Sequence, residues 1–156
     1  MARAPDSTQP TPNPAANSAA IPADACELYA ADRASQGLGM RLLEVRTGFA
    51  RLQMQVRDDM LNGHRICHGG FIFCLADSAF AFACNAGRPV TVAAAVSIEF
   101  LRPARQGAEL IATAQERSRG RRTGIYDIEV HSIDGECIAL ARGRSHEPSP
   151  RGLDRA

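Results

Sequence analysis

The sequence contains no CxxC pair and no internal repeat, and it carries little net charge. Its 18 basic residues nearly balance 17 aspartates and glutamates, which leaves a formal net charge of +1. Proteins that bind duplex nucleic acid are usually strongly basic, so this balance argues against nucleic acid as the main partner. Five cysteines without CxxC spacing favour free thiols in a reducing compartment, which predicts a cytoplasmic location.

The first 22 residues lack the apolar run of a secretory signal. They hold five of the nine prolines, set among Ser, Thr, Asn and Ala. Such a stretch buries too little apolar surface to offset its ordering entropy, so we predict a disordered tail over 1–22. We expect one domain with a real core over 23–147, and a second tail over 148–156.

One apolar stretch dominates the middle of the chain. From Gly70 to Ala86 the one ionisable carboxylate is Asp77, amid Phe, Ala, Cys, Leu and Ile. The alanine-rich composition favours a helix, which Gly69 precedes and Pro89 ends. A helix that is apolar nearly all round belongs in an interior, and an acid in its middle makes it a poor membrane span. The pattern predicts a buried helix with a single carboxylate.

Strand patterns surround this helix. A short helix over 25–35, capped by Asp24, precedes them, and Asp134-Gly135 signals a two-residue hairpin. Residues 49–57 alternate between apolar and polar side chains, as a half-buried antiparallel strand does. The other strands are expected over 40–46, 90–100, around 110–114, 125–133 and 136–146. The order predicts an α+β fold, with the long helix on one face of a curved antiparallel sheet.

Several motifs in this order resemble the hotdog-fold acyl-CoA thioesterases, and within them the phenylacetyl-CoA thioesterases of phenylacetate degradation (the PaaI type). The motifs are Leu61-Asn-Gly-His64, His68-Gly-Gly70, Leu75-Ala-Asp77, Phe100-Leu-Arg-Pro103, Thr123-Gly-Ile-Tyr-Asp-Ile128 and Arg142-Gly-Arg-Ser-His146. The resemblance covers about residues 25–147. It implies a hotdog fold of about six strands around the helix, an acyl-CoA substrate, hotdog dimers that often pair into tetramers, and no metal or redox cofactor.

Thioester hydrolysis needs an activated water or a nucleophile, and a group that stabilises the oxygen as it gains charge. Asp77 can serve as general base toward water, or attack to form a mixed anhydride. Burial raises the pKa of a carboxyl group unless hydrogen bonds hold it ionised. The structural alternatives are a buried acid tied to a backbone or hydroxyl partner, and an acid exposed at a subunit edge.

Gly69 and Gly70 lie where the first N–H groups of a helix have no internal partner. Those donors, aided by the helix dipole, can polarise a carbonyl, and the resemblance favours Gly69 as the oxyanion donor. Paired glycines at a loop-to-helix junction can also be present only because they allow the backbone conformation required there. Gly69 and Asp77 are about 12 Å apart along one helix, so we expect the site to pair Gly69 of one subunit with Asp77 of another.

The loop before the helix carries further candidates. The resemblance implies that Asn62 and His68 line the pocket, with His64 beside them. A metal site at His64, Cys67 and His68 lacks the further ligands of a structural zinc site. A nucleophilic Cys67 with His68 as base is disfavoured because adjacent loop residues rarely present their side chains to each other.

Ser78 follows Asp77 and stands where relatives carry a small hydroxyl residue. It can hold the lytic water or the acid, or bond to its own helix backbone. The chain departs from some relatives, which place an Asn or an acid near the end of the N-terminal helix, where this chain has Ala31 before Asp32. Other relatives use a strand hydroxyl, where this chain has Ala93 and Ala95.

Arginines cluster at strand ends and tips, where guanidinium groups match the phosphates of coenzyme A. The cluster comprises Arg119, Arg121 and Arg122, with Arg102 and Arg105. An arginine-rich hairpin tip can equally be a solvated turn. The resemblance, more than the arginines, predicts an acyl-CoA thioesterase acting on aryl-acetyl-CoA or similar esters. The alternatives are a hotdog dehydratase or hydratase, and an acyl-CoA sensor without catalysis.

Overall fold

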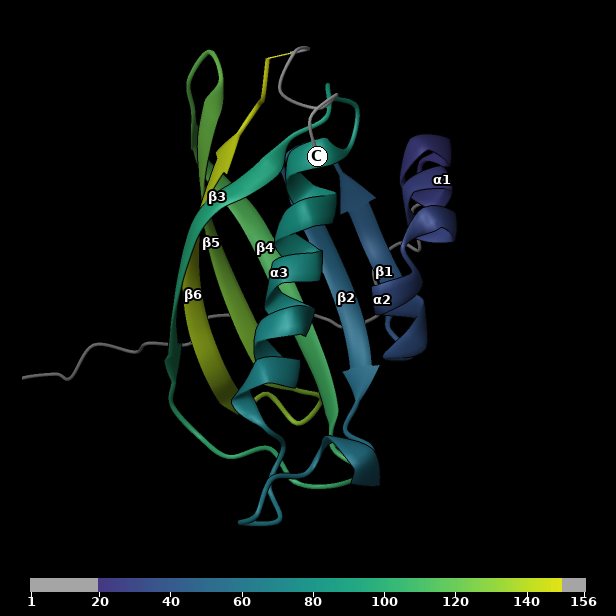
Figure 1. The fold of residues 1–156 in the computed structure, drawn as a ribbon, viewed down its shortest axis with the longest axis vertical. Helices are drawn as coiled ribbons and strands as arrows, with labels where there is room; N and C mark the ends of the chain where they lie inside the picture. Colours follow the sequence, from purple (N-terminus) through teal and green to yellow (C-terminus); the bar gives the residue numbers. More distant parts are fainter. Residues whose placement is uncertain (1–19, 150–156) are drawn as a thin grey trace, which may run out of the picture.

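A computed structural model describes residues 20–149, which form one six-stranded antiparallel sheet and three α-helices (Figure 1). The strand order is β1-β2-β4-β5-β6-β3. The predicted tail over 1–22 lies mostly outside the described residues, as do residues 150–156 of the predicted C-terminal tail. The strands are β1 (Arg41–Arg46), β2 (Phe49–Gln55), β3 (Val92–Phe100), β4 (Glu109–Arg119), β5 (Thr123–Ser132) and β6 (Cys137–His146).

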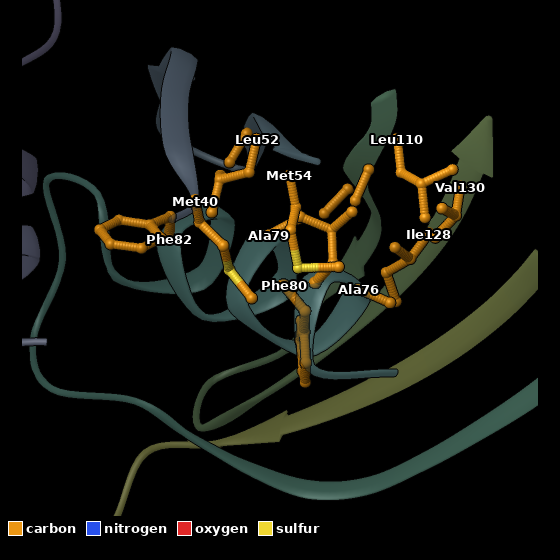
Figure 2. Packing of buried hydrophobic residues seen from close by; sticks show 14 of the residues in the cluster. Met40, Leu52, Met54, Ala76, Ala79, Phe80, Phe82, Leu110, Ile128 and Val130 are labelled. Carbon is orange, nitrogen blue, oxygen red and sulfur yellow. The ribbon is translucent and has the colours of Figure 1, made fainter. Parts of the chain in front are cut away.

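The long helix α3 (Gly69–Asn85) lies across the concave face of the sheet, within one residue of the predicted start and end. Ala76, Ala79 and Ala83 of this helix are fully buried, and the ring of Phe80 packs against that of Tyr126 with 5.1 Å between the centroids. Small side chains let a helix sit close to a sheet. The resulting core draws on α3 and on the inner faces of β2, β4 and β5 (Figure 2). The predicted α+β hotdog architecture is confirmed.

The strands β2 and β4 show why the sheet forms. Leu52 and Met54 in β2 pair with Ala112 and Leu110 in β4, and all four side chains are fully buried. The predicted alternation is confirmed on the apolar face. On the other face Gln53 is also buried, because its amide donates to Glu109 of the adjacent strand.

The N-terminal helix differs from the prediction. It is two helices, α1 (Ala23–Ala31) and α2 (Arg33–Gly37), which meet at Asp32. The break arises because the Asp32 carboxylate accepts the N–H of Ser35 and caps the second helix. The predicted cap at Asp24 is wrong: α1 is preceded by Pro22, and Asp24 lies in its first turn, where its carboxylate accepts the N–H of Gly87.

The edge strand β3 is far more exposed than its apolar pattern indicated. Val92 and Phe100 are 44% and 51% exposed, although they share the face predicted to be apolar. A register shift between Ala93 and Ala95 interrupts the ladder with β6. β3 pairs with β6 on one side alone, so its other edge is open within residues 20–149.

The hairpin between β5 and β6 is present, but its connection is longer than the two residues predicted. Four residues, 133–136, separate the strands. The Gly135 N–H donates to the carbonyl of Ser132, and Gly135 takes a positive φ of 89°. Glycine tolerates this conformation at no steric cost, so the Asp-Gly pair still marks the turn.

Candidate active site

The N-terminus of α3 presents backbone donors beside an ordered histidine. His68 is the N-cap residue, and its Nδ1 accepts the N–H of Gly70 at 3.1 Å. With Nδ1 as the acceptor, the proton of the neutral imidazole lies on Nε2, which can then donate outward. The N–H of Gly69 has no acceptor among the described residues. Of the two predicted glycine donors, Gly69 is therefore the free one.

A hollow of about 460 Å³ opens beside this helix end. Its lining brings Gly69 and Asn62 together with an apolar wall that includes Ile66, Ile72 and Phe100. The Oδ1 of Asn62 accepts the N–H groups of His64 and Ile66, which turns the Asn62 amide nitrogen into the remaining side-chain donor. Two residues with available N–H donors, Gly69 and Asn62, thus border a largely apolar space large enough for an acyl group.

The Phe100-Leu-Arg-Pro103 segment contributes to the family resemblance, but no role was predicted for its apolar members. All four residues line the hollow. Their position next to proline, at the end of a predicted strand, was the available signal. Three predicted site residues are, in contrast, exposed and outside the lining: His64, His68 and Gly70.

Asp77 lies two turns further along α3 and is half-buried. Burial raises the pKa of its carboxyl group, and no hydrogen bond or neighbouring charge offsets that effect. The alternative of an acid tied to a structural partner does not hold within the described residues. Asp77 and Gly69 are about 12 Å apart along the helix axis, so one subunit does not bring them to a single thioester carbon.

The next residue, Ser78, does not bond to its own helix backbone. Its Oγ lies 2.8 Å from Oγ of Ser35 in α2, and Ser35 Oγ donates to the Asp32 carboxylate at 2.6 Å. Neither Ser35 nor this connection was predicted. The Asp32-x-x-Ser35 spacing is a helix-capping signal, which could have revealed the first half of the chain of contacts.

The cysteine beside His68 is unsuited to nucleophilic chemistry. Cys67 is buried, and burial raises the pKa of its thiol to about 11. A neutral thiol is a weak nucleophile. Within residues 20–149 no three His, Cys, Asp or Glu side chains gather as a metal site would require.

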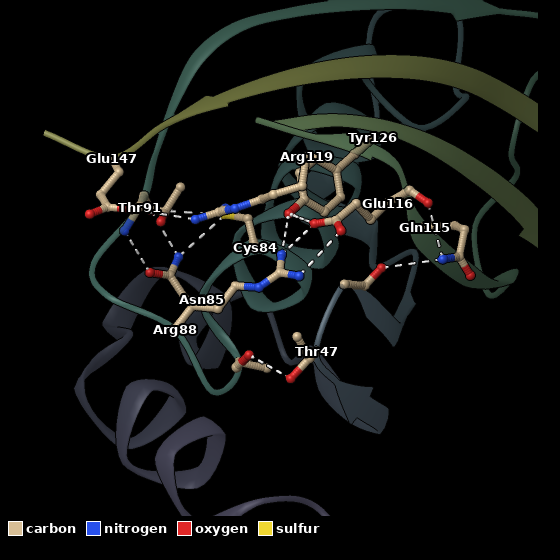
Figure 3. Close-up of polar contacts among 12 residues, drawn as sticks. Thr47, Cys84, Asn85, Arg88, Thr91, Gln115, Glu116, Arg119, Tyr126 and Glu147 are labelled. Carbon is tan, nitrogen blue, oxygen red and sulfur yellow. Dashed lines mark hydrogen bonds and ion pairs between the residues drawn. The ribbon is translucent and has the colours of Figure 1, made fainter. Parts of the chain in front are cut away.

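The arginines of the β4–β5 hairpin differ in how firmly they are held. Arg119 pairs with the Glu147 carboxylate at 3.5 Å (Figure 3), and Arg122 donates to the Glu147 carbonyl. Arg121 is exposed at the tip. The hairpin lies at the end of the molecule where α3 finishes, away from the start of α3 (Figure 1). Arg102 is the one arginine of the predicted cluster that lines the hollow beside Gly69.

Comparisons with known proteins identify the family. The Thioesterase superfamily profile matches residues 64–139. The chain is 47% identical over 119 residues to the Acyl-coenzyme A thioesterase PaaI of Escherichia coli (strain K12), covering 76% of this chain and 85% of that protein. The chain belongs to the thioesterase superfamily.

Solved structures of superfamily members agree. The E. coli PaaI protein from the phenylacetic acid degradation operon superposes with a TM-score of 0.79 at 45% identity, covering 81% of this chain and 91% of that one. A mutant of the phenylacetic acid degradation protein PaaI from Thermus thermophilus gives 0.70 at 38% identity, with 73% and 97% covered. The resemblance to PaaI-type hotdog thioesterases and the prediction of a thioester hydrolase are confirmed. None of the helices between residues 20 and 149 combines the length and the apolar character that a membrane span requires.

Proposed function

We propose that this thioesterase hydrolyses phenylacetyl-CoA, or a related aryl- or acyl-CoA ester, to the free acid and CoA. The observation that carries the proposal is the free carboxylate of Asp77, half-buried on the same helix whose first N–H, at Gly69, opens into an apolar hollow. The identity to PaaI proteins named for phenylacetic acid degradation supports the aryl-acetyl class and a role in phenylacetate degradation.

In the proposed reaction Asp77 takes a proton from water while the water oxygen bonds to the thioester carbon. The carbonyl oxygen gains negative charge and accepts the N–H of Gly69 at the positive end of the α3 dipole. The carbon–sulfur bond then breaks, and CoA leaves as the thiol after taking up a proton. In the alternative course Asp77 attacks the carbon itself, the carbon–sulfur bond breaks to release CoA as the thiol after protonation, and water then hydrolyses the mixed anhydride to free the acid and restore Asp77. His68 Nε2 and the Asn62 amide donate toward the substrate beside Gly69 in either course.

The proposed site spans two subunits, with Gly69 of one facing the partner's Asp77. The open edge of β3 supports this arrangement, because a nine-residue strand with one unpaired edge and exposed apolar side chains forms a template for a second strand. Antiparallel pairing of two β3 edges about a two-fold axis would give an isologous dimer with two equivalent sites. Pairing of two such dimers would give the expected tetramer.

The substrate has two parts, and different regions would hold them. The apolar wall of the hollow suits an aromatic acyl group, whereas arginines at Arg102 and Arg121 would meet the CoA phosphates, with Arg119 and Arg122 beside Arg121. The scheme uses no metal or redox cofactor. All five cysteines are free thiols, which fits the proposed cytoplasmic location.

Release of free thiol from phenylacetyl-CoA and from aliphatic acyl-CoA esters tests the function. We expect turnover in the wild type and a loss of about 10²- to 10⁴-fold in Asp77→Asn, with Asp134→Asn as an exposed carboxylate control. An enoyl chromophore without thiol release would instead identify a dehydratase. Binding of CoA esters without either product would identify a sensor, and would disprove hydrolysis of those substrates.

A further inference from the structure

A chain of three side chains connects the N-terminal helices to the residue beside Asp77. Oδ2 of Asp32 accepts Ser35 Oγ at 2.6 Å, Oδ1 accepts the Ser35 N–H at 2.9 Å, and Ser35 Oγ lies 2.8 Å from Ser78 Oγ. Ser35 is 1% exposed, so water has almost no access to the middle of this chain. Ser78, at its end, is half-buried on α3.

The carboxylate of Asp32 determines which hydroxyl group is the donor in each hydrogen bond of this chain. An ionised carboxylate accepts hydrogen bonds and donates none. The single proton of the Ser35 hydroxyl is therefore committed to Asp32, and Ser35 Oγ acts as an acceptor toward Ser78. Ser78 must donate its proton to Ser35, which leaves the lone pairs of Ser78 Oγ free.

A capping role alone does not account for this geometry. A helix cap needs one carboxylate oxygen for a backbone N–H, and Oδ1 of Asp32 fills that role. A serine in a helix interior can donate to the backbone carbonyl one turn earlier. Ser78 donates out of its helix to Ser35 instead, and this fixes the rotation of its hydroxyl.

We propose that Asp32 and Ser35 are positioning residues that hold Ser78 Oγ as a hydrogen-bond acceptor for the lytic water. This inference rests on the proposed function. Asp77 would accept one proton of the water and Ser78 Oγ the other, so that a water lone pair points at the thioester carbon. Neither Asp32 nor Ser35 touches the substrate; both act through Ser78.

Two variants break the chain of hydrogen bonds from Asp32 through Ser35 to Ser78, which we call the relay, in different ways. Ser35→Ala removes the acceptor that orients Ser78. Asp32→Asn is isosteric, but its amide must turn its oxygen to the Ser35 N–H and its NH₂ to Ser35 Oγ, since two N–H groups cannot face each other. Ser35 would then donate to Ser78, which reverses the proton order while the cap persists.

We expect kcat for phenylacetyl-CoA to fall about threefold to tenfold in Ser35→Ala and in Asp32→Asn, with KM unchanged, since each loses about one hydrogen bond of orientation. In a Ser78→Ala background, Ser35→Ala should cause no further loss of kcat. Ser145→Ala is the matched control, because Ser145 is also buried but has no hydrogen-bond partner within residues 20–149.

Three outcomes overturn the inference. Full kcat in both relay variants, even with a lowered Tm, would reduce the relay to a structural role. Losses of Ser35→Ala and Ser78→Ala that multiply in the double variant would mean that Ser35 does not act through Ser78. A wild type that releases no thiol from any CoA ester would overturn the proposed function and this inference with it, whereas the first two outcomes leave the function intact.

Discussion

The ring of Phe100 lies so close to Gly69 that a methyl group at position 69 would come within 3.0 Å of its Cζ. Few Cβ atoms tolerate such a contact, so Gly69→Ala must displace the ring or the helix end. Because the Gly69 N–H and Phe100 both border the hollow, we expect kcat/KM for phenylacetyl-CoA to fall about 10²-fold. Steady-state thiol release measures this loss.

Gly37→Ala is the control for that substitution. A methyl group at Gly37 would meet no atom within 4 Å, and alanine favours the helix in which Gly37 lies. Its activity should equal that of the wild type. Equal activity of Gly69→Ala and the wild type would contradict the placement of the Gly69 N–H at the reacting carbonyl.

The buried carboxylate of Asp77 should lower the free energy of unfolding at the pH at which it acts as a base. Burial raises its pKa above the ordinary value of 3.8, so the folded state binds the proton more tightly than the unfolded state. The free energy of unfolding therefore falls as pH rises through the interval between these pKa values, and the penalty is complete above it. Asp77→Asn should raise Tm at pH 7 while abolishing most turnover, and the gain in Tm should vanish below about pH 4. Thermal unfolding followed across pH checks this.

Asp59→Asn provides the opposite case. A hydrogen bond from Arg57 lowers the pKa of the exposed Asp59 carboxyl, so the substitution should not raise Tm.

The pKa of Asp77 also predicts the acid limb of kcat/KM, which should lie above 3.8 because the base must be ionised. An Asp77→Asn variant with a lower Tm at pH 7 would contradict the buried, unpaired carboxylate.

The open β3 edge predicts the effect of a charge placed on it. Val92→Asp would place a charge among the exposed apolar side chains of the edge at which two β3 strands would pair, so we expect smaller particles by light scattering and a loss of activity of at least about tenfold. Ile133→Asp is matched, because Ile133 is 58% exposed in the β5–β6 loop, against 44% for Val92. A smaller but fully active Val92→Asp variant would argue against a site shared by two subunits.

The hairpin arginines predict a difference between long and short substrates. Arg121 is exposed, whereas Glu147 holds Arg119 and Arg122, so Arg121 is the member freest to meet a phosphate. Arg121→Ala should raise KM for phenylacetyl-CoA about tenfold and leave KM for the N-acetylcysteamine thioester unchanged. Arg33→Ala, an exposed arginine in α2, is the control. An equal rise with both substrates would exclude a phosphate contact.

The elements that could be predicted from the sequence are those whose formation depends on local residue patterns within one chain. The helix α3 was predicted within one residue because its apolar run and flanking glycines are local signals. The pattern of β3 correctly marked an apolar strand, but alternation does not reveal whether the same chain or another one covers it. The break at Asp32 depends on a side-chain cap that competes with a continuous helix.

The candidate site also contains some residues that could be predicted from local patterns and others that could not. Asp77 and Gly69 stand out by chemistry, as a carboxylate in an apolar helix and a glycine at its start. Ser35 and Ser78 are 43 positions apart, so their contact depends on how α2 docks beside α3, which no local pattern encodes. The contacts of Arg119 and Arg122 with Glu147 likewise depend on tertiary structure, because they require the chain after β6 to lie beside the β4–β5 hairpin tip.

The strand order has a consequence for synthesis on the ribosome. Within residues 20–149, β3 pairs with β6 alone, and β6 is translated after the other five strands, about 40 residues later than β3. While β4 and β5 pair, the nascent chain carries β3 with both edges unpaired and its apolar side chains exposed. Closure of the sheet therefore coincides with completion of β6, and a stop codon before residue 137 would leave β3 available for aggregation.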